Sequence, residues 1–339
     1  MAPINVALIG YGLAGRVFHA PLIAAVDGLT LAAVVSSREE EIRKTYPSVA
    51  VLRNPQQAFA DPSIGLVVVA APNDSHFDLA AAALAHGKHV VIDKPFALTS
   101  AQARDLIRRA TGRVLSVFHN RRWDSDFLTL KRLFCDGALG EVVYFESHFD
   151  RFRPEATQRW RERAGPATGS WYDLGSHLLD QAVELFGRPR AIAADLAARR
   201  DGAVTTDYFH VVLRYEHLRV VLAGDSLAPA DDVRFIVHGT GASYIKHGLD
   251  TQEPYLNSGG KPGDAAYGID PRPGYLVLPG GTERPVTALR GDYGAYYRGL
   301  RDTLAGTAPV PVPAREALAV MELLEAGGMS SAQRREIVV

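Results

Sequence analysis

Residues Ile4–Gly15, with the sequence INVALIGYGLAG, place a short apolar run directly before a glycine-rich turn. The run is typical of a strand that is buried on both faces, and the G-x-G-x-x-G after it leads into a helical pattern. In such a turn Gly10 permits the tight bend, Gly12 lets the backbone approach a pyrophosphate, and Gly15 packs the helix on the strand. Free N–H groups at a helix start also favour phosphate. We therefore expect the following residues to bind a dinucleotide: Gly10, Gly12, Leu13, Ala14 and Gly15.

The first third of the chain alternates apolar runs with helical patterns. The predicted strands are Ile4–Ile9, Leu31–Val35, Leu66–Ala71, His89–Ile92 and Val114–Phe118. The predicted helices are Ala14–Val26, Glu39–Lys44, Ser75–His86 and Ser100–Ala110. This alternation predicts right-handed βαβ units, and hence an α/β domain of the Rossmann type with a doubly wound parallel sheet.

The pattern changes after about Asn120. Strand-like runs follow one another without intervening helices, which predicts an α+β domain with a large, open, mixed or antiparallel sheet. Its predicted strands are Glu141–Phe149, Ala191–Ala197, Tyr208–Tyr215, Arg219–Ala223, Arg234–His238 and Ala242–Lys246. Its predicted helices are Asp124–Cys135, Trp171–Phe186, Tyr293–Leu304 and Ala314–Ala326, with a long loop over Asp250–Gly274. We expect two domains, residues 1–120 and 121–339.

Length and composition fit this organisation and exclude several classes of protein. The 339 residues exceed one ordinary core, and a formal net charge of −1 argues against a nucleic-acid partner. The single cysteine, Cys135, allows neither an intramolecular disulfide nor a cysteine metal site, and no other metal-ligand cluster is evident. There is no signal-peptide pattern and no apolar stretch of about 20 residues, so we expect a cytoplasmic protein without membrane contacts.

The end of the second predicted strand bears on the choice of cofactor. An NAD-preferring fold usually has Asp or Glu there to hold the ribose 2′-hydroxyl. This chain has Ser36, Ser37 and Arg38 instead, followed by acidic residues that suit the first turn of a helix. Because arginine binds phosphate with charge-assisted hydrogen bonds, we expect these three residues to hold the 2′-phosphate of NADP(H). The alternative for Arg38 is a solvated surface side chain.

Two segments carry candidate acid–base residues. Asp93-Lys94-Pro95 follows an apolar strand at its carboxyl end, where open α/β sheets bind ligands. Asp173 and His177 are four residues apart at a helix start, and therefore share a face. Histidine carries protons near neutral pH. The alternatives are a lysine that only orders its turn and a satisfied structural histidine.

Asn120, Arg122 and Trp123 follow the last predicted strand of the first domain. Their place at a strand end suggests a cleft wall, and amide and guanidinium groups suit a polyol. Together with His177 we expect them to bind substrate. The alternative is a hinge and helix start.

Four segments together resemble one family, the glucose–fructose oxidoreductase/inositol dehydrogenase/MocA-like (Gfo/Idh/MocA) oxidoreductases. They are Gly10–Gly15, Pro72-Asn73-Asp74-Ser75-His76, Asp93-Lys94-Pro95 and Asp173–His177. The stretch Gly12–Leu22 and Arg121-Arg122-Trp123 look closest to the NADP-dependent scyllo-inositol dehydrogenase branch. One departure is Asp93, where the family usually has Glu.

The resemblance implies roles for several of these residues. Lys94, Asp173 and His177 would be the catalytic residues, and Asn73 and His76 would lie by the nicotinamide ribose. The expected cofactor contacts in this region are Ala71, Pro72, Asn73, His76, Asp93 and Lys94. The resemblance also implies a homodimer or homotetramer.

The function expected on these grounds is NADP(H)-dependent hydride transfer to or from a cyclic polyol or sugar, with an inositol as the substrate that the resemblance favours. Two alternatives stay open. The same fold could reduce another carbonyl or imine compound. The protein could instead be a regulator that senses NADP(H) without turnover. Loss of the lysine or the histidine would favour this alternative, but Lys94 and His177 are both present here.

Overall fold

The structure is a computed structural model that describes residues 3–157, 162–229 and 232–339. It resolves into two compact units. The first unit comprises Met1–Asn120, Gln252–Tyr267 and Asp292–Leu318, and the second comprises Arg121–Thr251, Gly268–Gly291 and Ala319–Val339. Two segments that follow Asn120 thus fold with the first unit. One of them does so because aromatic rings pack together: Tyr296 meets Phe118 edge-on, with ring centroids 4.9 Å apart.

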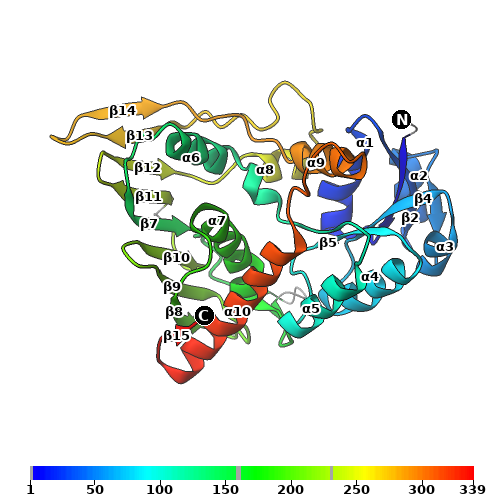
Figure 1. The fold of residues 1–339 in the computed structure, drawn as a ribbon, viewed down its shortest axis with the longest axis horizontal. Coiled ribbons are helices and arrows are strands. Elements are labelled where there is room, and N and C mark those ends of the chain that lie inside the picture. Colours follow the sequence, from blue (N-terminus) through cyan, green and yellow to red (C-terminus); the bar gives the residue numbers. More distant parts are fainter. Residues whose placement is uncertain (1–2, 158–161, 230–231) are drawn as a thin grey trace. The chain divides into compact units, whose positions relative to one another are not determined.

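The first unit is built on a six-stranded sheet in the order β3-β2-β1-β4-β5-β6; Figure 1 labels β2, β4 and β5 of this sheet. Every strand pair is parallel, which confirms the doubly wound sheet. The strands are β1 (Ile4–Ile9), β2 (Leu29–Val35), β3 (Ala50–Leu52), β4 (Ile64–Val69), β5 (His89–Asp93) and β6 (Leu115–Phe118). The order reverses between β1 and β4, so a ligand crevice is expected at their carboxyl ends.

Helical segments connect these strands or follow them in the chain. They are η1 (Gly15–His19), α1 (Ala20–Ala24), α2 (Glu39–Thr45), α3 (Pro55–Ala60), η2 (Asn73–Ser75), α4 (His76–Ala85), α5 (Ser100–Arg109), η3 (Asn120–Trp123), α8 (Gln252–Asn257) and α9 (Gly294–Leu304). The predicted helix Ala14–Val26 begins as a π-helical turn, η1, before α1. The prediction of an uninterrupted loop over Asp250–Gly274 is wrong, because α8 lies within it.

The second unit contains a nine-stranded sheet in the order β14-β13-β12-β11-β7-β10-β9-β8-β15. The pair β7 and β10 is parallel and the others are antiparallel, so the sheet is mixed, as expected. The strands are β7 (Val142–His148), β8 (Ala191–Ala197), β9 (Tyr208–Arg214), β10 (Arg219–Asp225), β11 (Val233–Gly239), β12 (Ser243–His247), β13 (Gly274–Val277), β14 (Glu283–Val286) and β15 (Ile337–Val338). The sequence did not predict β13, β14 or β15.

One face of this sheet is covered by the helices of the second unit (Figure 1). They are α6 (Ser125–Cys135), α7 (Ser176–Phe186), which follows the π turn η5 (Trp171–Gly175), and most of α10 (Ala314–Gln333). Phe145 on β7 contacts Phe186 on α7, with ring centroids 5.3 Å apart. The Ser330 hydroxyl on α10 accepts a 2.9 Å hydrogen bond from the Ala194 amide on β8.

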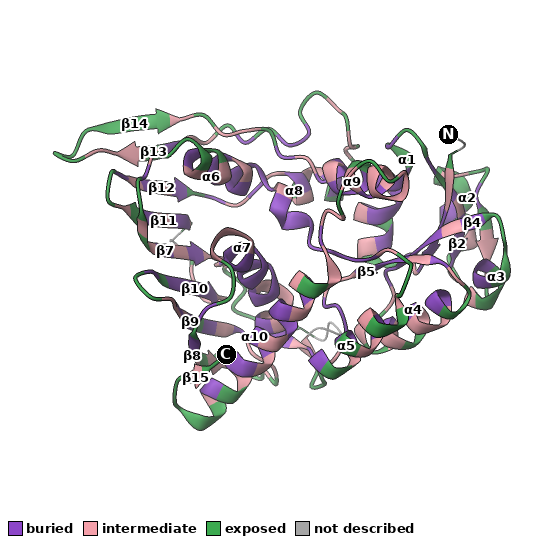
Figure 2. Ribbon diagram, in the orientation of Figure 1, coloured by how far each residue is buried: buried purple, intermediate pink, exposed green. Residues whose placement is uncertain are grey.

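Many residues on the central strands of both sheets are buried, whereas the edge strand β14 is largely exposed (Figure 2). Val6–Leu8, Leu66–Val69 and Val90–Ile92 are fully buried in the first unit, as expected for central parallel strands. Across the described ranges, no helix combines the length and the apolar character needed to cross a membrane.

Candidate active site

In the glycine turn of the first unit, two glycines have no room for a side chain and one faces open space. A Cβ on Gly10, whose φ is +100°, would lie 2.4 Å from the Ala70 carbonyl oxygen. A Cβ on Gly15 would lie 2.3 Å from the carbonyl oxygen of Gly10. A Cβ on Gly12 would meet nothing within 4 Å. The turn therefore leaves free space above Gly12, next to exposed Leu13, which fits the close approach of a dinucleotide pyrophosphate.

The carboxyl end of β2 brings two arginines together. Arg38 is exposed, its amide donates to the Ser36 hydroxyl at 3.1 Å, and its guanidinium lies 3.4 Å from Glu41. Arg53, which follows β3, donates to the Ser37 carbonyl at 3.1 Å and to Glu39 at 3.2 Å. Sequence reasoning missed Arg53 because β3 has only three residues and was not predicted.

The exits of β4 and β5 are joined by a buried histidine. One ring nitrogen of His76 lies 2.9 Å from the carbonyl oxygen of Ala71, and the other lies 2.9 Å from that of Pro95. His76 is 1% exposed. Its ring therefore ties the Ala71–Asn73 segment to the turn that carries Lys94, while Pro72 is exposed and Asn73 half-buried.

Asp93 and Lys94 form the turn at the end of β5. Both side chains are half-buried, and the Lys94–Pro95 peptide bond is cis. The Asp93 carboxylate accepts a 2.8 Å hydrogen bond from the Lys94 amide. Burial raises the pKa of the Asp93 carboxyl, but the interaction with His19 and the charges of Lys94 and His76 outweigh burial and lower the pKa overall. Asp93 is thus a carboxylate at neutral pH, and the charge of Lys94 helps to stabilise it.

In the second unit, Asp173 and His177 lie at the junction of η5 and α7. His177 is 5% exposed and Asp173 is half-buried. The Trp171 indole N–H at the start of η5 donates to the Leu324 carbonyl on α10 at 3.0 Å. A Cβ on Gly175 would lie 2.3 Å from the Trp171 ring, so the backbone packs tightly against Trp171 two residues before His177.

The helix that carries His177 is anchored by buried charges. Both oxygens of Asp180 accept hydrogen bonds from Arg122, at 2.8 and 2.7 Å. Glu184, one turn further, lies 3.3 Å from Arg122 and 2.5 Å from Lys131. Burial raises the pKa of Glu184 despite these two cations.

This arrangement differs from the expectation that Arg122 lines a cleft, because Arg122 is 4% exposed and its guanidinium is bound to Asp180 on α7. Asn120, in the first unit, is 7% exposed. Trp123, in the second, is half-buried.

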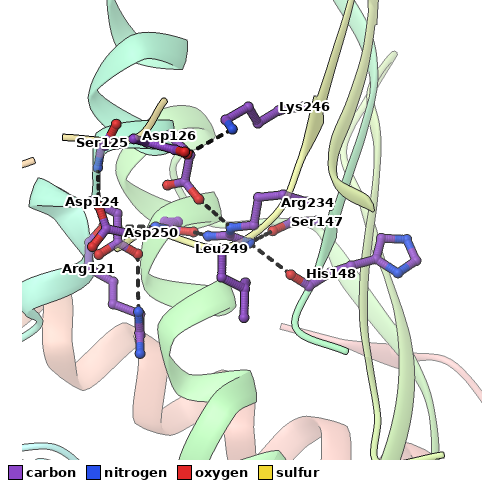
Figure 3. A network of polar contacts seen from close by, with 12 residues as sticks. Arg121, Asp124, Ser125, Asp126, Ser147, His148, Arg234, Lys246, Leu249 and Asp250 are labelled. Atoms are coloured by element: carbon purple, nitrogen blue, oxygen red, sulfur yellow. Dashed lines mark hydrogen bonds and ion pairs between the residues drawn. The ribbon is translucent and has the colours of Figure 1, made fainter. Parts of the chain in front are cut away.

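A second set of polar contacts, centred on Arg234, joins α7 to the neighbouring strands (Figure 3). Arg234 donates to Asp126 at 2.8 Å, to the Ser147 hydroxyl at 2.7 Å and to the Gln181 side chain at 2.7 Å. Gln181 in turn donates to the Arg121 carbonyl at 2.9 Å. One side of α7 is thus fixed to β7, β11 and the segment at residue 121.

Arg121 itself pairs with Asp124 at 3.3 Å, and Asp250 accepts from the Ser125 amide at 2.8 Å (Figure 3). Burial and the nearby Asp250 charge hold the pKa of Asp124 well above its ordinary value, against the pull of Arg121. Among the described residues, no group of three or more His, Cys, Asp or Glu side chains is arranged to hold a metal ion.

Comparison with known proteins covers almost the whole chain. The family description "Oxidoreductase family, NAD-binding Rossmann fold" matches residues 4–119, and "Oxidoreductase family, C-terminal alpha/beta domain" matches residues 131–339. Both belong to the Gfo/Idh/MocA group.

Similar proteins span the same length. The chain is 53% identical to the uncharacterized oxidoreductase YdgJ of Escherichia coli, covering 98% of this chain and 97% of the relative. It is 40% identical to the scyllo-inositol 2-dehydrogenase (NADP(+)) IolW of Bacillus subtilis, covering 99% and 96%. The solved structure of the Yersinia pestis protein YPO2259 superposes with a TM-score of 0.96 at 52% identity, covering 100% and 97%. The chain is therefore an NAD(P)-binding oxidoreductase of the Gfo/Idh/MocA family.

Proposed function

We propose that this protein is an NADP(H)-dependent dehydrogenase of cyclic polyols, with an inositol as substrate. The observation that carries the proposal is the Asp93-Lys94 turn, in which half-buried Lys94 directly follows an ionised carboxylate at the end of a central parallel strand. The Lys94 amine can hydrogen-bond a reacting hydroxyl. The similarity to IolW, named as a scyllo-inositol dehydrogenase, supports the substrate class.

The preference for NADP(H) is supported by the charges at the end of β2. The Arg38 amide contacts the Ser36 hydroxyl and the Arg53 guanidinium contacts the Ser37 carbonyl. Glu39 and Glu41, two of the three acidic residues that follow, form ion pairs with arginines. These arginines suit a 2′-phosphate, because arginine binds phosphate in a bidentate manner. None of the three residues Ser36, Ser37 and Arg38 has a carboxylate that could accept a hydrogen bond from a ribose 2′-hydroxyl.

In the proposed mechanism the residues of this chain handle the proton. When bound, the nicotinamide accepts or donates the hydride. During oxidation the substrate hydroxyl gives its hydrogen-bonded proton to Lys94 or His177 while its C–H hydride leaves, and reduction returns both. Asp173 orients His177, and Asp93 stabilises the Lys94 turn. The glycine turn and Asn73 would hold the cofactor, and Asn120 and Trp123 would contact the polyol.

Initial rates with a panel of inositols, sugars and their ketones, measured with NADP⁺ and NAD⁺ side by side, test this proposal. We expect turnover of an inositol with NADP⁺ preferred. Turnover restricted to another carbonyl or imine compound would overturn the substrate class. NADPH binding without turnover of any of these compounds would instead support a nucleotide-sensing protein.

A further inference from the structure

A fully buried histidine lies behind the Asp93-Lys94 turn of the first unit. His19 is the last residue of η1 and is 0% exposed. Its Nδ1 atom lies 2.6 Å from the hydroxyl oxygen of Tyr297 on α9, and its Nε2 atom lies 3.9 Å from Oδ2 of Asp93. The other carboxylate oxygen of Asp93 accepts a hydrogen bond from the Lys94 amide. A chain of polar groups therefore connects the phenol, the imidazole and the carboxylate to the backbone of Lys94.

Aromatic packing fixes the imidazole in this position. The ring centroid of His19 lies 4.4 Å from that of Phe118, and the Tyr297 ring stands nearly perpendicular to it at 6.2 Å. Phe118 is 2% exposed and Tyr297 is 0% exposed. The ring cannot turn toward solvent without opening this cluster, so its two nitrogens keep their distinct neighbours.

The protonation state of Tyr297 decides which nitrogen of the neutral His19 ring carries the proton. Burial raises the pKa of the Tyr297 phenol well above its ordinary value, and Tyr296 and Asp93 add to the effect. The phenol is therefore neutral and has one O–H to donate to Nδ1. The ring proton then lies on Nε2, facing the carboxylate. The reverse assignment in a neutral ring would turn a lone pair toward Asp93, which is electrostatically unfavourable.

No described residue lies within hydrogen-bond distance of Nε2. At 3.9 Å the contact with Asp93 is longer than a hydrogen bond, so it acts through charge. The titratable groups around this pair are Asp93 on β5, Lys94 in the turn, His76 on α4, and Tyr296 and Tyr297 on α9. The charge of Lys94 stabilises the Asp93 carboxylate, and by reciprocity the carboxylate stabilises the Lys94 ammonium.

We propose that His19 is a positioning residue for Lys94, which acts by offsetting part of the Asp93 charge and so sets the pH at which the Lys94 amine becomes neutral. The inference deepens the proposed function, since a neutral amine is the form that can take a proton from a hydroxyl. The protonation of Lys94 can nevertheless be measured without substrate, so the two proposals are tested separately.

The test is competitive labelling of Lys94 with acetic anhydride, read by mass spectrometry of the full-length protein from about pH 6 to about pH 11, which spans histidine and lysine titration. In His19→Phe, which keeps an aromatic ring against Phe118, the labelling midpoint should rise by about 0.5 pH unit or more, because Asp93 acts on Lys94 without its partner. In Asp93→Asn the midpoint should fall.

The double variant makes the test specific to the route through Asp93. In the Asp93→Asn background, adding His19→Phe should leave the midpoint unchanged. Tyr297→Phe, which keeps His19 but removes the phenol, should give a smaller rise, and it serves if His19→Phe does not fold. His89→Gln is the control on the same strand, because His89 accepts from the Val114 amide at the opposite end of β5. We expect no shift there.

The outcomes separate the two proposals. Equal midpoints in wild type, His19→Phe and Tyr297→Phe would overturn the role of His19, whether or not inositol is turned over. An undiminished effect of His19→Phe in the Asp93→Asn background would overturn the route through Asp93. Shifted midpoints in an enzyme that oxidises no polyol would contradict only the proposed function.

Discussion

Two exposed arginines at the end of β2 differ in how they are held. Arg38 has only a 3.4 Å contact with Glu41, whereas Arg53 bonds both a backbone carbonyl and Glu39. Because charge-assisted contacts to phosphate contribute about 1.5–3 kcal/mol, we predict that Arg38→Ala and Arg53→Ala each weaken NADPH binding about tenfold or more. NADH binding should change little. Fluorescence titration with both nucleotides measures this, and equal losses for the two would contradict a 2′-phosphate role.

The proton-handling residues should affect turnover and leave cofactor binding intact. A well-placed acid or base contributes about 10²–10⁴-fold to the rate. We therefore expect Lys94→Ala and His177→Ala each to lower kcat by about that factor at nearly wild-type NADPH affinity. Steady-state kinetics and nucleotide titration on the same preparations provide the measurement. A variant that turns over at the wild-type rate would remove its residue from the proposed mechanism.

At the residue scale, sequence reasoning succeeded where a residue type is tied to a local motif. The glycines fit because Gly10 and Gly15 have no room for a Cβ. His19 and Arg53 were not predicted, since their partners are distant in sequence: Tyr297 for one, and the Ser37 carbonyl beside a short unpredicted strand for the other. Arg122 was expected in a cleft because it follows a strand end, and its partner Asp180, 58 residues away, could not be identified from the sequence.

At the scale of elements, the Arg122–Asp180 pair should stabilise α7 and with it the position of His177. Removing one partner of a buried ion pair costs about 3–5 kcal/mol when the remaining charge is left buried without compensation. Because Glu184 still lies 3.3 Å from Arg122, we predict that Asp180→Ala loses stability to urea toward the lower end of that range and also lowers kcat. The double variant Arg122→Met/Asp180→Leu should recover most of the stability.

The exposed pair Arg190–Glu216 is a matched control in the same unit. Its side chains are 63% and 62% exposed at an N–O distance of 2.7 Å, so Glu216→Gln should cost less than about 1 kcal/mol. Equal losses for Asp180→Ala and Glu216→Gln would show that burial of the first pair does not matter.

Strand β7 carries a histidine between two carboxylates. His148 contacts Glu146 at 2.7 Å and Asp150 at 2.8 Å. Burial lowers the pKa of His148, but the hydrogen bonds and charges of Asp150 and Glu146 outweigh burial and raise it overall. A raised folded-state pKa stabilises the protein below the unfolded value of about 6.5, and this contribution is lost as the pH rises through the folded-state pKa.

We therefore predict that His148→Gln destabilises the protein more at about pH 6 than at about pH 9, near and well above the ordinary histidine pKa. Urea denaturation of both proteins at the two pH values measures the difference. His217→Gln, at an exposed loop position, provides the control. A stability difference that grows from the acidic to the alkaline condition would contradict the sign of the shift.

Long periodic elements could be predicted from sequence, and short or irregular ones could not. The runs that became β1 and β8 were predicted with the bounds that the structure gives. The edge strands β14 and β15 and the neighbouring strand β13 have two to four residues each, too few for alternation to be visible. The π turns at η1 and η5 place a histidine at or just after their ends, and helical periodicity does not distinguish them from α-helix.

At the scale of the molecule, the parallel and mixed sheets were predictable because each has its own hydrophobic pattern. The way the chain passes between the two compact units was not. Gln252–Tyr267 and Asp292–Leu318 fold with the first unit through side-chain contacts such as that of Ser116 with Tyr296, at 2.8 Å. Contacts 180 residues apart leave no local signal in a sequence.

The second sheet has an apolar row on the face opposite its helices. Phe145 and Ser147 of β7 point toward α7 and Arg234, so Glu146 between them points to the other face. Strand pairing places Ile236 and Val221 on either side of Glu146. The row continues through Val212, Ile245 and Tyr275. The row is apolar except for Glu146 at its centre, Tyr275 is 38% exposed, and an apolar patch of this kind is typical of a protein interface.

We propose that this face joins identical subunits, and we predict a dimer or tetramer by light scattering after size exclusion. A charge buried in an interface without a partner is costly, so Ile236→Glu/Ile245→Glu should give monomers at micromolar concentration. Ala101→Glu adds a charge at an exposed position on α5 and should leave the assembly intact. A monomeric wild type would contradict the proposal. An oligomer that survives both glutamates would place the interface on another surface.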